Sequence, residues 1–151
     1  MGTRRTPAAM APERNGDGLV DALAQSAFLV VGVLTRVAAE HDLSLTQLRV
    51  LAILRDRRLR ITALADHLGL EKSTLSGLVD RAAARGLLAR FPSPTDGRVV
   101  EVGLTPEGKA LATRGSEQVR GLLSSTVDGL NRAEQRRLRA LLEKLLGRPR
   151  T

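Results

Sequence analysis

The order of residue patterns over residues 64–104 constrains the fold of this chain more than any other feature of its sequence. A short apolar stripe ends at Gly69, a residue suited to the left-handed backbone of a tight turn, and a second stripe follows directly. The second stripe consists of Leu75, Leu78, Val79 and Ala82, at i, i+3, i+4 and i+7. This spacing predicts a helix over residues 72–85, closed by Gly86. Two short helices joined by a tight turn predict a helix-turn-helix unit.

A hairpin is predicted directly after these two helices. Residues 87–91 and 99–104 are rich in apolar and β-branched side chains, and the polar segment between them carries Pro92, Pro94 and Gly97. Asp96 next to Gly97 is a turn signal at the tip. Short helix, tight turn, helix and hairpin in this order are typical of a winged helix-turn-helix fold, in which the hairpin is the wing.

Further helices are predicted before this unit. The spacing of apolar residues predicts a long first helix over residues 19–40, with Asp17 as a candidate cap. Thr46 is predicted to cap the second helix, and Thr62 the short third one. The expected buried stripe of the second helix is Leu48, Leu51, Ala52 and Leu54.

Two more helices are predicted after the hairpin. Thr105 followed by Pro106 signals the start of a fifth helix, which we expect to run to about residue 129. A sixth helix is predicted over residues 132–146, with Leu138, Leu141, Leu142 and Leu145 buried. The fold class is therefore mainly α with a small β-hairpin wing: a winged helix-turn-helix domain plus terminal helices that form a dimerisation region.

The basic balance and the missing residue types narrow the classes of function. The chain holds 24 Lys and Arg against 16 Asp and Glu, a net charge of +8 that favours a nucleic-acid partner. Only Phe28 and Phe91 are aromatic, so the stacking used by single-strand binders is nearly absent and duplex DNA is favoured. With no Cys, only His41 and His67 as histidines and no phosphate-binding glycine loop, we expect neither an enzyme nor a cofactor or metal.

The predicted fourth helix presents a surface suited to a DNA groove. Its outward positions hold small, polar or charged residues, and short hydroxyls let a helix approach the groove floor closely. The predicted DNA-binding residues on this helix are Lys72, Ser73, Thr74, Ser76, Gly77 and Arg81. On the wing, Arg98 is predicted to enter a minor groove, held in position by a charge-assisted hydrogen bond to Asp96. Taken alone, the helix also fits an ordinary surface helix, and Arg98 a solvated hairpin arginine.

Four stretches of the chain resemble the MarR family of bacterial transcriptional regulators. They are LSLTQLRVLAIL at residues 43–54, LADHLGLEKSTLSGLVDRAAARGLL at 64–88, DGR at 96–98 and LTPEGKAL at 104–111. The resemblance implies that the first, fifth and sixth helices form a dimer interface, that the fourth helix reads DNA and that the wing arginine enters the minor groove. Many members release DNA when a small, often aromatic or anionic, molecule binds between the dimer helices and the DNA-binding lobe.

Two positions depart from the family pattern. The family often has a basic side chain where this sequence has Gly77, which puts one base or phosphate contact in doubt. Ala82 replaces a commonly larger apolar residue, which predicts a thinner core under the fourth helix.

We expect a disordered tail over residues 1–16 and a single domain over 17–147. Within it, residues 45–104 form the DNA-binding lobe, and residues 19–40 and 106–146 the dimerisation helices. The predicted function is a sequence-specific regulator of transcription, a repressor that binds a pseudo-palindromic operator in double-stranded DNA as a homodimer. A non-specific architectural DNA-binding protein is the alternative that charge and fold also permit.

A small aromatic or anionic effector is the remaining predicted partner. Its candidate pocket residues are Phe28, Leu29, His41, Leu48 and Leu51, which fit an ordinary core equally well. The amino-terminal residues lack the apolar run of a signal peptide, and no run of about 18 apolar residues is found, so we expect a cytoplasmic protein with no membrane partner.

Overall fold

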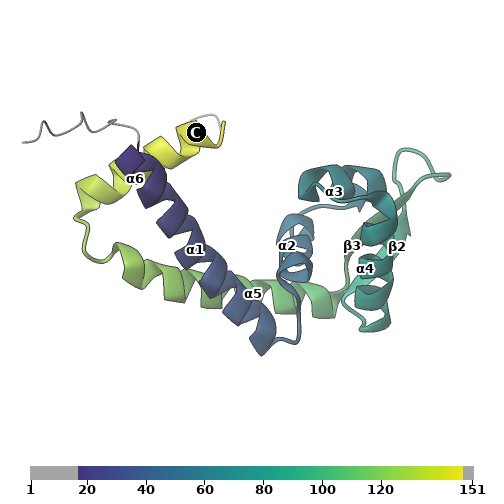
Figure 1. Ribbon diagram of the computed structural model, residues 1–151. Helices are drawn as coiled ribbons and strands as arrows, with labels where there is room; N and C mark the ends of the chain where they lie inside the picture. Colours follow the sequence, from purple (N-terminus) through teal and green to yellow (C-terminus); the bar gives the residue numbers. More distant parts are fainter. Residues whose placement is uncertain (1–16, 148–151) are drawn as a thin grey trace, which may run out of the picture. The chain divides into compact units, whose positions relative to one another are not determined.

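The computed structural model describes residues 17–147 and shows a largely helical chain with one small sheet (Figure 1). The predicted tail over residues 1–16 lies outside the described residues. The elements, in chain order, are α1 (Asp17–Glu40), α2 (Leu45–Leu54), β1 (Leu59–Arg60), α3 (Ile61–Leu68), α4 (Lys72–Ala84), β2 (Leu88–Pro92), β3 (Val100–Leu104), α5 (Pro106–Ser124), the 3₁₀ turn η1 (Ser125–Val127) and α6 (Arg132–Leu145). The predicted fold class is confirmed.

The chain divides into two compact units, Met1–Gly32 and Val33–Thr151. The described part of the first unit consists of residues 17–32 of α1. The second unit contains the end of α1 and every later element.

The second unit is built on a three-stranded antiparallel sheet in the order β1-β3-β2. β2 and β3 form the predicted hairpin, with Leu88 opposite Leu104 and Pro92 opposite Val100. β1 was not predicted. It is only two residues long, too short to show an alternation of apolar and polar residues. It exists because it pairs with Val102 and Glu101 of β3, which lie far away in the sequence.

One hydrophobic core joins α2, α3, α4, the sheet and the first half of α5 (Figure 1). The predicted stripe of α4 is confirmed, since Leu75, Leu78, Val79 and Ala82 are all buried. In α2 the stripe is partly wrong: Ala52 is exposed and Val50 is buried in its place. Val50 precedes Leu51 and Ala52 follows it, so the buried face of α2 is rotated from the predicted face towards Val50.

Two predicted helix caps are wrong. α2 is capped by Ser44, whose Oγ accepts a hydrogen bond from the Gln47 N–H at 3.1 Å while the Gln47 side chain accepts one from the Ser44 N–H at 2.8 Å. This reciprocal pair requires Glu or Gln three residues after the cap, which Thr46 lacks. α3 begins one residue before Thr62, because the extended residue at its start is Arg60, which pairs with β3.

The predicted start of α5 is confirmed and its predicted end is wrong. The Thr105 hydroxyl accepts from the Gly108 N–H at 3.0 Å, with Pro106 in the first helical position. The helix ends at Ser124 rather than near residue 129. Three consecutive hydroxyls there, those of Ser124, Ser125 and Thr126, donate to carbonyls three residues earlier and compete with the helical ladder.

α6 is capped by Asn131, whose side chain accepts from the Glu134 N–H while the Glu134 side chain accepts from the Asn131 N–H. The leucines of this helix are exposed within the single chain. The prediction that they are buried is therefore wrong for the chain on its own. Leu138, Leu141, Leu142 and Leu145 of α6, together with Leu146 directly after it, are between 39% and 64% exposed. On the same helix a hydrogen bond to Glu143, and the charge of that carboxylate, raise the pKa of Arg139.

The part of α1 in the first unit is also apolar and exposed. Its exposed large side chains are Leu19, Val20, Leu23, Phe28, Leu29 and Val31. By length and composition alone the segment from Gly18 to Glu40 is long and apolar enough to cross a membrane. Exposed apolar surfaces of this size are typical of contacts with another protein or with lipid.

Candidate nucleic-acid interface

α3 and α4 are joined by a tight turn that depends on Gly69. This residue has φ +65°, in the left-handed region that glycine adopts without strain. The Leu70 N–H donates to the Ala65 carbonyl across the turn at 3.0 Å. The predicted stop at Gly69 is confirmed, and the turn fixes where α4 starts.

The outward face of α4 carries the residues predicted to contact DNA. Leu75 and Val79 are 0% exposed on the opposite face and anchor the helix to the core. Lys72, Ser73, Thr74 and Arg81 are exposed, whereas Ser76 and Gly77 are half-buried. The structure thus brings these six residues onto one helix beside the wing; their contacts with DNA stay predictions.

Gly77 shares its surface with Arg81. A Cβ built at Gly77 meets only one atom within 4 Å outside its own backbone surroundings, the Arg81 Nη1 at 3.4 Å. The Arg81 guanidinium therefore lies over the glycine, one helical turn away. A cation is present at this part of the helix surface although residue 77 has no side chain.

An ion pair ties α4 to the wing. Arg90 of β2 donates from Nη2 to the Asp80 carboxylate at 2.7 Å. Both side chains are partly exposed, 43% and 58%, so the pair contributes little to stability. It does hold the base of the wing next to the outward face of α4.

The tip of the wing is ordered by its own backbone. The Ser93 N–H donates to the Val99 carbonyl at 2.8 Å, and the Val99 N–H donates to the Asp96 carbonyl at 2.9 Å. The Asp96 carboxylate accepts from the backbone N–H of Arg98 at 3.0 Å, so the predicted bond between the two residues is present and is made by the backbone of Arg98. An aspartate commonly bonds the N–H two residues on in a turn, and this leaves the guanidinium unengaged by Asp96.

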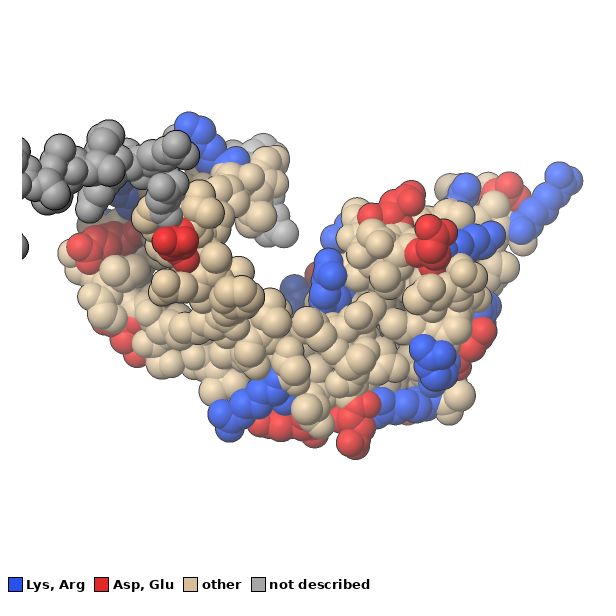
Figure 2. Space-filling view, in the orientation of Figure 1, with Lys and Arg blue, Asp and Glu red and all other residues tan. Residues whose placement is uncertain are grey.

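Basic side chains are prominent at this end of the second unit. In Figure 2 blue side chains project at the tip of the wing, and blue and red ones mix over the α3 and α4 surface. At the base of the wing the Arg58 guanidinium stacks on the Phe91 ring, 3.7 Å from its centre. A Cβ at Gly103 would lie 2.8 Å from Arg58, so glycine is what leaves room for the stack.

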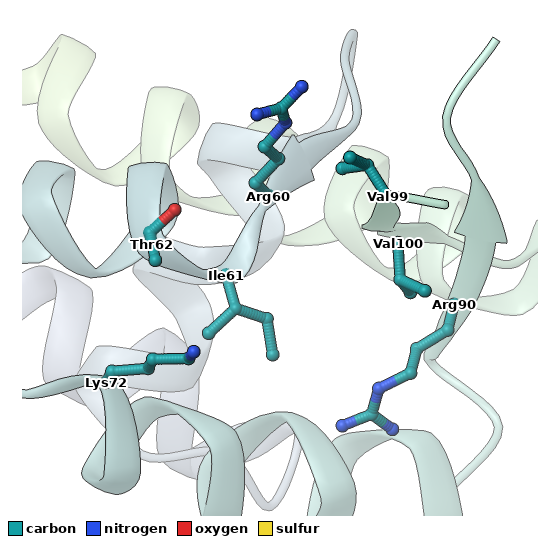
Figure 3. Close-up of a pocket in the computed structure, with 7 residues that line it drawn as sticks. All are labelled: Arg60, Ile61, Thr62, Lys72, Arg90, Val99 and Val100. Carbon is teal, nitrogen blue, oxygen red and sulfur yellow. The ribbon is translucent and has the colours of Figure 1, made fainter. Parts of the chain in front are cut away.

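Sequence reasoning missed a pocket between α4 and the wing (Figure 3). Its lining includes Lys72 at the start of α4 and Val99, the neighbour of Arg98. Arg60, Thr62 and Arg90 also line it and were not predicted as site residues. Arg90 shares a face of β2 with the buried Leu88, so strand alternation gave no signal for it, and Arg60 required knowledge of β1.

The predicted effector residues lie in different surroundings. Phe28 and Leu29 belong to the first unit and are 76% and 48% exposed. In the second unit, Leu48 and Leu51 are buried in the core, and His41 shares a hydrogen bond between its Nε2 and the Gln118 Oε1 at 2.5 Å. Leu48 and Leu51 are therefore core residues of this unit, and the effector pocket stays a prediction.

The order of elements in the second unit, with two helices joined by a tight turn and followed by a hairpin, defines a winged helix-turn-helix protein. Residues 41–99 match the model described as "MarR family". The helix-turn-helix and most of the wing lie inside this match. By this match and by its fold the chain is similar to members of the MarR family.

Known proteins of this class are similar over most of the chain. The HTH-type transcriptional repressor IacR of Pseudomonas putida is 34% identical over 109 residues, 72% of this chain, and the chain spans 65% of the length of that repressor. A structure of BpsR from Bordetella bronchiseptica is 29% identical with a TM-score of 0.69, covering 89% of this chain and 97% of that one. It concerns regulation of the DNA binding of BpsR by 6-hydroxynicotinic acid. Wild-type apo MarR from E. coli is 25% identical with a TM-score of 0.68, covering 91% and 98%.

Proposed function

We propose that this chain is a transcriptional repressor that binds a specific, pseudo-palindromic site in double-stranded DNA as a homodimer. The observation that carries the proposal is the pairing of α4 with the wing in one rigid lobe, tied by the Asp80–Arg90 contact. In this class of fold the second helix of the unit enters a major groove and the wing reaches the neighbouring minor groove. The repressor relative IacR supports the direction of regulation.

Sequence readout is assigned to α4. Ser73 and Ser76 present hydroxyls that bond base edges or phosphates, and Lys72 and Thr74 flank them at the helix start. Arg81, lying over Gly77, supplies the cation that residue 77 lacks. Arg98 is assigned to the minor groove, and Asp96 orders the turn that carries it.

A second copy of the chain is the proposed partner of the exposed apolar surfaces. Each large apolar side chain that becomes fully buried contributes about 1.5–3 kcal/mol, so the four exposed leucines of α6 and the adjacent Leu146 offer a strong association energy. The apolar surface of α1 in the first unit is assigned to the same association, in place of a membrane. A chain of 16.2 kDa is then expected to sediment at twice that mass, about 32 kDa, without detergent.

A small aromatic or anionic effector is proposed to weaken DNA binding. The support is the regulation of BpsR by 6-hydroxynicotinic acid, a small aromatic acid. A thermal-shift screen of such acids tests this, because a ligand that prefers the folded state raises the melting temperature. If no acid in the panel raises Tm or lowers DNA affinity, effector control by this class of molecule is contradicted.

The decisive experiment separates specific regulation from architectural coating. Binding sites are selected from a random duplex pool, and the selected site is titrated against a scrambled duplex at one fixed salt concentration. We expect the selected site to bind about a thousandfold more tightly. A difference below about tenfold supports the architectural alternative, and no binding to any duplex at low salt contradicts both.

A further inference from the structure

An open pocket of about 260 Å³ lies between α4 and the base of the wing (Figure 3). Its lining residues are Arg60, Ile61, Thr62, Lys72, Arg90, Val99 and Val100. They come from β1, the first turn of α3, the first residue of α4, β2 and the residues where β3 begins. Four segments that are separate in sequence therefore meet around one depression.

The lining combines cations with an apolar floor. Ile61, Val99 and Val100 supply the apolar surface, and Val100 is 50% exposed although it is a large hydrophobic residue. In Figure 3 the Lys72 side chain points towards Ile61, and Arg60 stands at the rim. A ligand suited to this lining joins a negatively charged oxygen group to a compact carbon body.

The start of α3, which lies at the pocket, has no side-chain cap. α2, α5 and α6 begin with Ser44, Thr105 and Asn131, whose side chains bond the first-turn N–H groups. α3 begins after Arg60, which makes no such bond. First-turn N–H groups without a side-chain cap favour an anion, and here a cation stands where a capping oxygen usually does.

Arg90 lines the pocket while part of its guanidinium is engaged by Asp80. In Figure 3 its side chain extends towards α4, where one of its N–H groups bonds Asp80. A guanidinium carries five N–H donors, so the others remain available to a second anion. Three cations and one carboxylate leave a net charge of +2 around the depression.

The position of the pocket identifies its occupant. A single sugar-phosphate strand separates each major groove of a duplex from the minor groove beside it. A protein that inserts α4 into the major groove and the wing into the adjacent minor groove has to cross that strand. The pocket lies between Lys72, next to Ser73, and Val99, next to Arg98, and so between the two elements assigned to the two grooves.

We propose that this pocket holds a sugar-phosphate unit of the strand between the two grooves, an inference that rests on the proposed function. Arg60, Lys72 and Arg90 contact the phosphate, and the Thr62 hydroxyl donates to it. The apolar floor contacts the deoxyribose carbons. The pocket fixes the register of the lobe on DNA and carries no sequence information itself.

The first test compares variants that each remove one positive charge. Arg60→Gln removes a pocket cation, and Arg49→Gln removes an exposed cation of α2 that does not line the pocket. On one duplex we expect Arg60→Gln to weaken binding about tenfold, equally for selected and scrambled sequences, and to reduce the salt dependence. Arg49→Gln is expected to change affinity less than twofold. Equal effects of the two variants overturn the proposal.

The second test assigns the phosphate. Single phosphates of the selected duplex are replaced one at a time by uncharged methylphosphonates. Wild-type protein is expected to lose affinity at one position per half-site, between the α4 and wing contacts, and Arg60→Gln is expected to be insensitive there. Equal sensitivity of both proteins at every position overturns the proposal.

Two further outcomes are distinguishable. If wild-type protein binds no duplex at low salt, the proposed function fails. If the DNA affinity of Arg60→Gln equals that of Arg49→Gln while only Arg60→Gln loses binding of inorganic phosphate or benzoate, the pocket holds a free anion and the backbone assignment is wrong. Unchanged melting temperatures of both variants show that the fold is intact.

Discussion

Gly108 is the position where the packing of the second unit leaves least room. It lies in the first turn of α5, and a Cβ there would be 2.0 Å from the Leu87 carbonyl oxygen and 3.0 Å from its carbon. An acceptable carbon–oxygen contact is about 3.3 Å, so Gly108→Ala has to move α5 away from residue 87 by about 1.3 Å. The Leu87 carbonyl also accepts from the Thr105 N–H and hydroxyl, at 3.1 and 3.2 Å.

The expected loss of stability follows from these contacts. Overpacking costs about 1–3 kcal/mol, and two weakened hydrogen bonds about 1 kcal/mol each, which gives about 3–5 kcal/mol for Gly108→Ala. We expect Tm to fall by about 10 °C or more, measured by circular dichroism at one protein concentration. The matched control is Gly121→Ala on the same helix, where nothing lies within 4 Å and a gain of about 0.5–1 kcal/mol is expected. A Gly108→Ala protein as stable as wild type refutes the packing argument.

Four other outcomes are expected. Arg98→Ala weakens duplex binding and lowers the slope of log K against log salt by about 0.9 per lost phosphate-region contact, measured by fluorescence anisotropy; an unchanged slope removes the wing arginine from the interface. Ser76→Leu abolishes binding by keeping α4 out of the groove and leaves the dimer folded, whereas binding that survives shows that α4 is not the reader. Leu145→Glu places a charge on a leucine that is 64% exposed in the chain and converts the 32 kDa species to monomer in sedimentation, unless α6 lies outside the interface. Asn131→Ala removes an N-cap bonded to two N–H groups and costs about 1 kcal/mol in urea denaturation, with Ser124→Ala as a control that is expected to cost less.

The order of the elements was predictable from the sequence because each is marked locally. Gly69, the stripe of α4 and the Thr105–Pro106 start all depend on residues within one turn or one helix. The features that local patterns did not predict depend on residues far away in the sequence. β1 exists because Leu59 and Arg60 pair with β3, and the α3 cap changed with it.

The same distinction applies to the candidate site. The outward face of α4 follows from its buried stripe, so Lys72 to Arg81 could be named from periodicity. The Asp80–Arg90 pair and the pocket that includes Arg60 join residues from different elements, and no spacing along the chain signals them. Asp96 was correctly placed in the turn, where its carboxylate accepts a hydrogen bond from the backbone N–H of Arg98.

In the proposed complex, α4 and the wing occupy adjacent grooves of one duplex, and the arrangement is repeated by two-fold symmetry. Because the chain contains no cysteine, a single one introduced as Ser73→Cys on α4 or Gly97→Cys on the wing carries an iron chelate that cleaves DNA locally. We expect cleavage centred in a major groove from residue 73 and in the flanking minor groove from residue 97, each repeated symmetrically in two half-sites. Cleavage from the two positions at unrelated places on the duplex, or none above the level of free chelate, would contradict this arrangement.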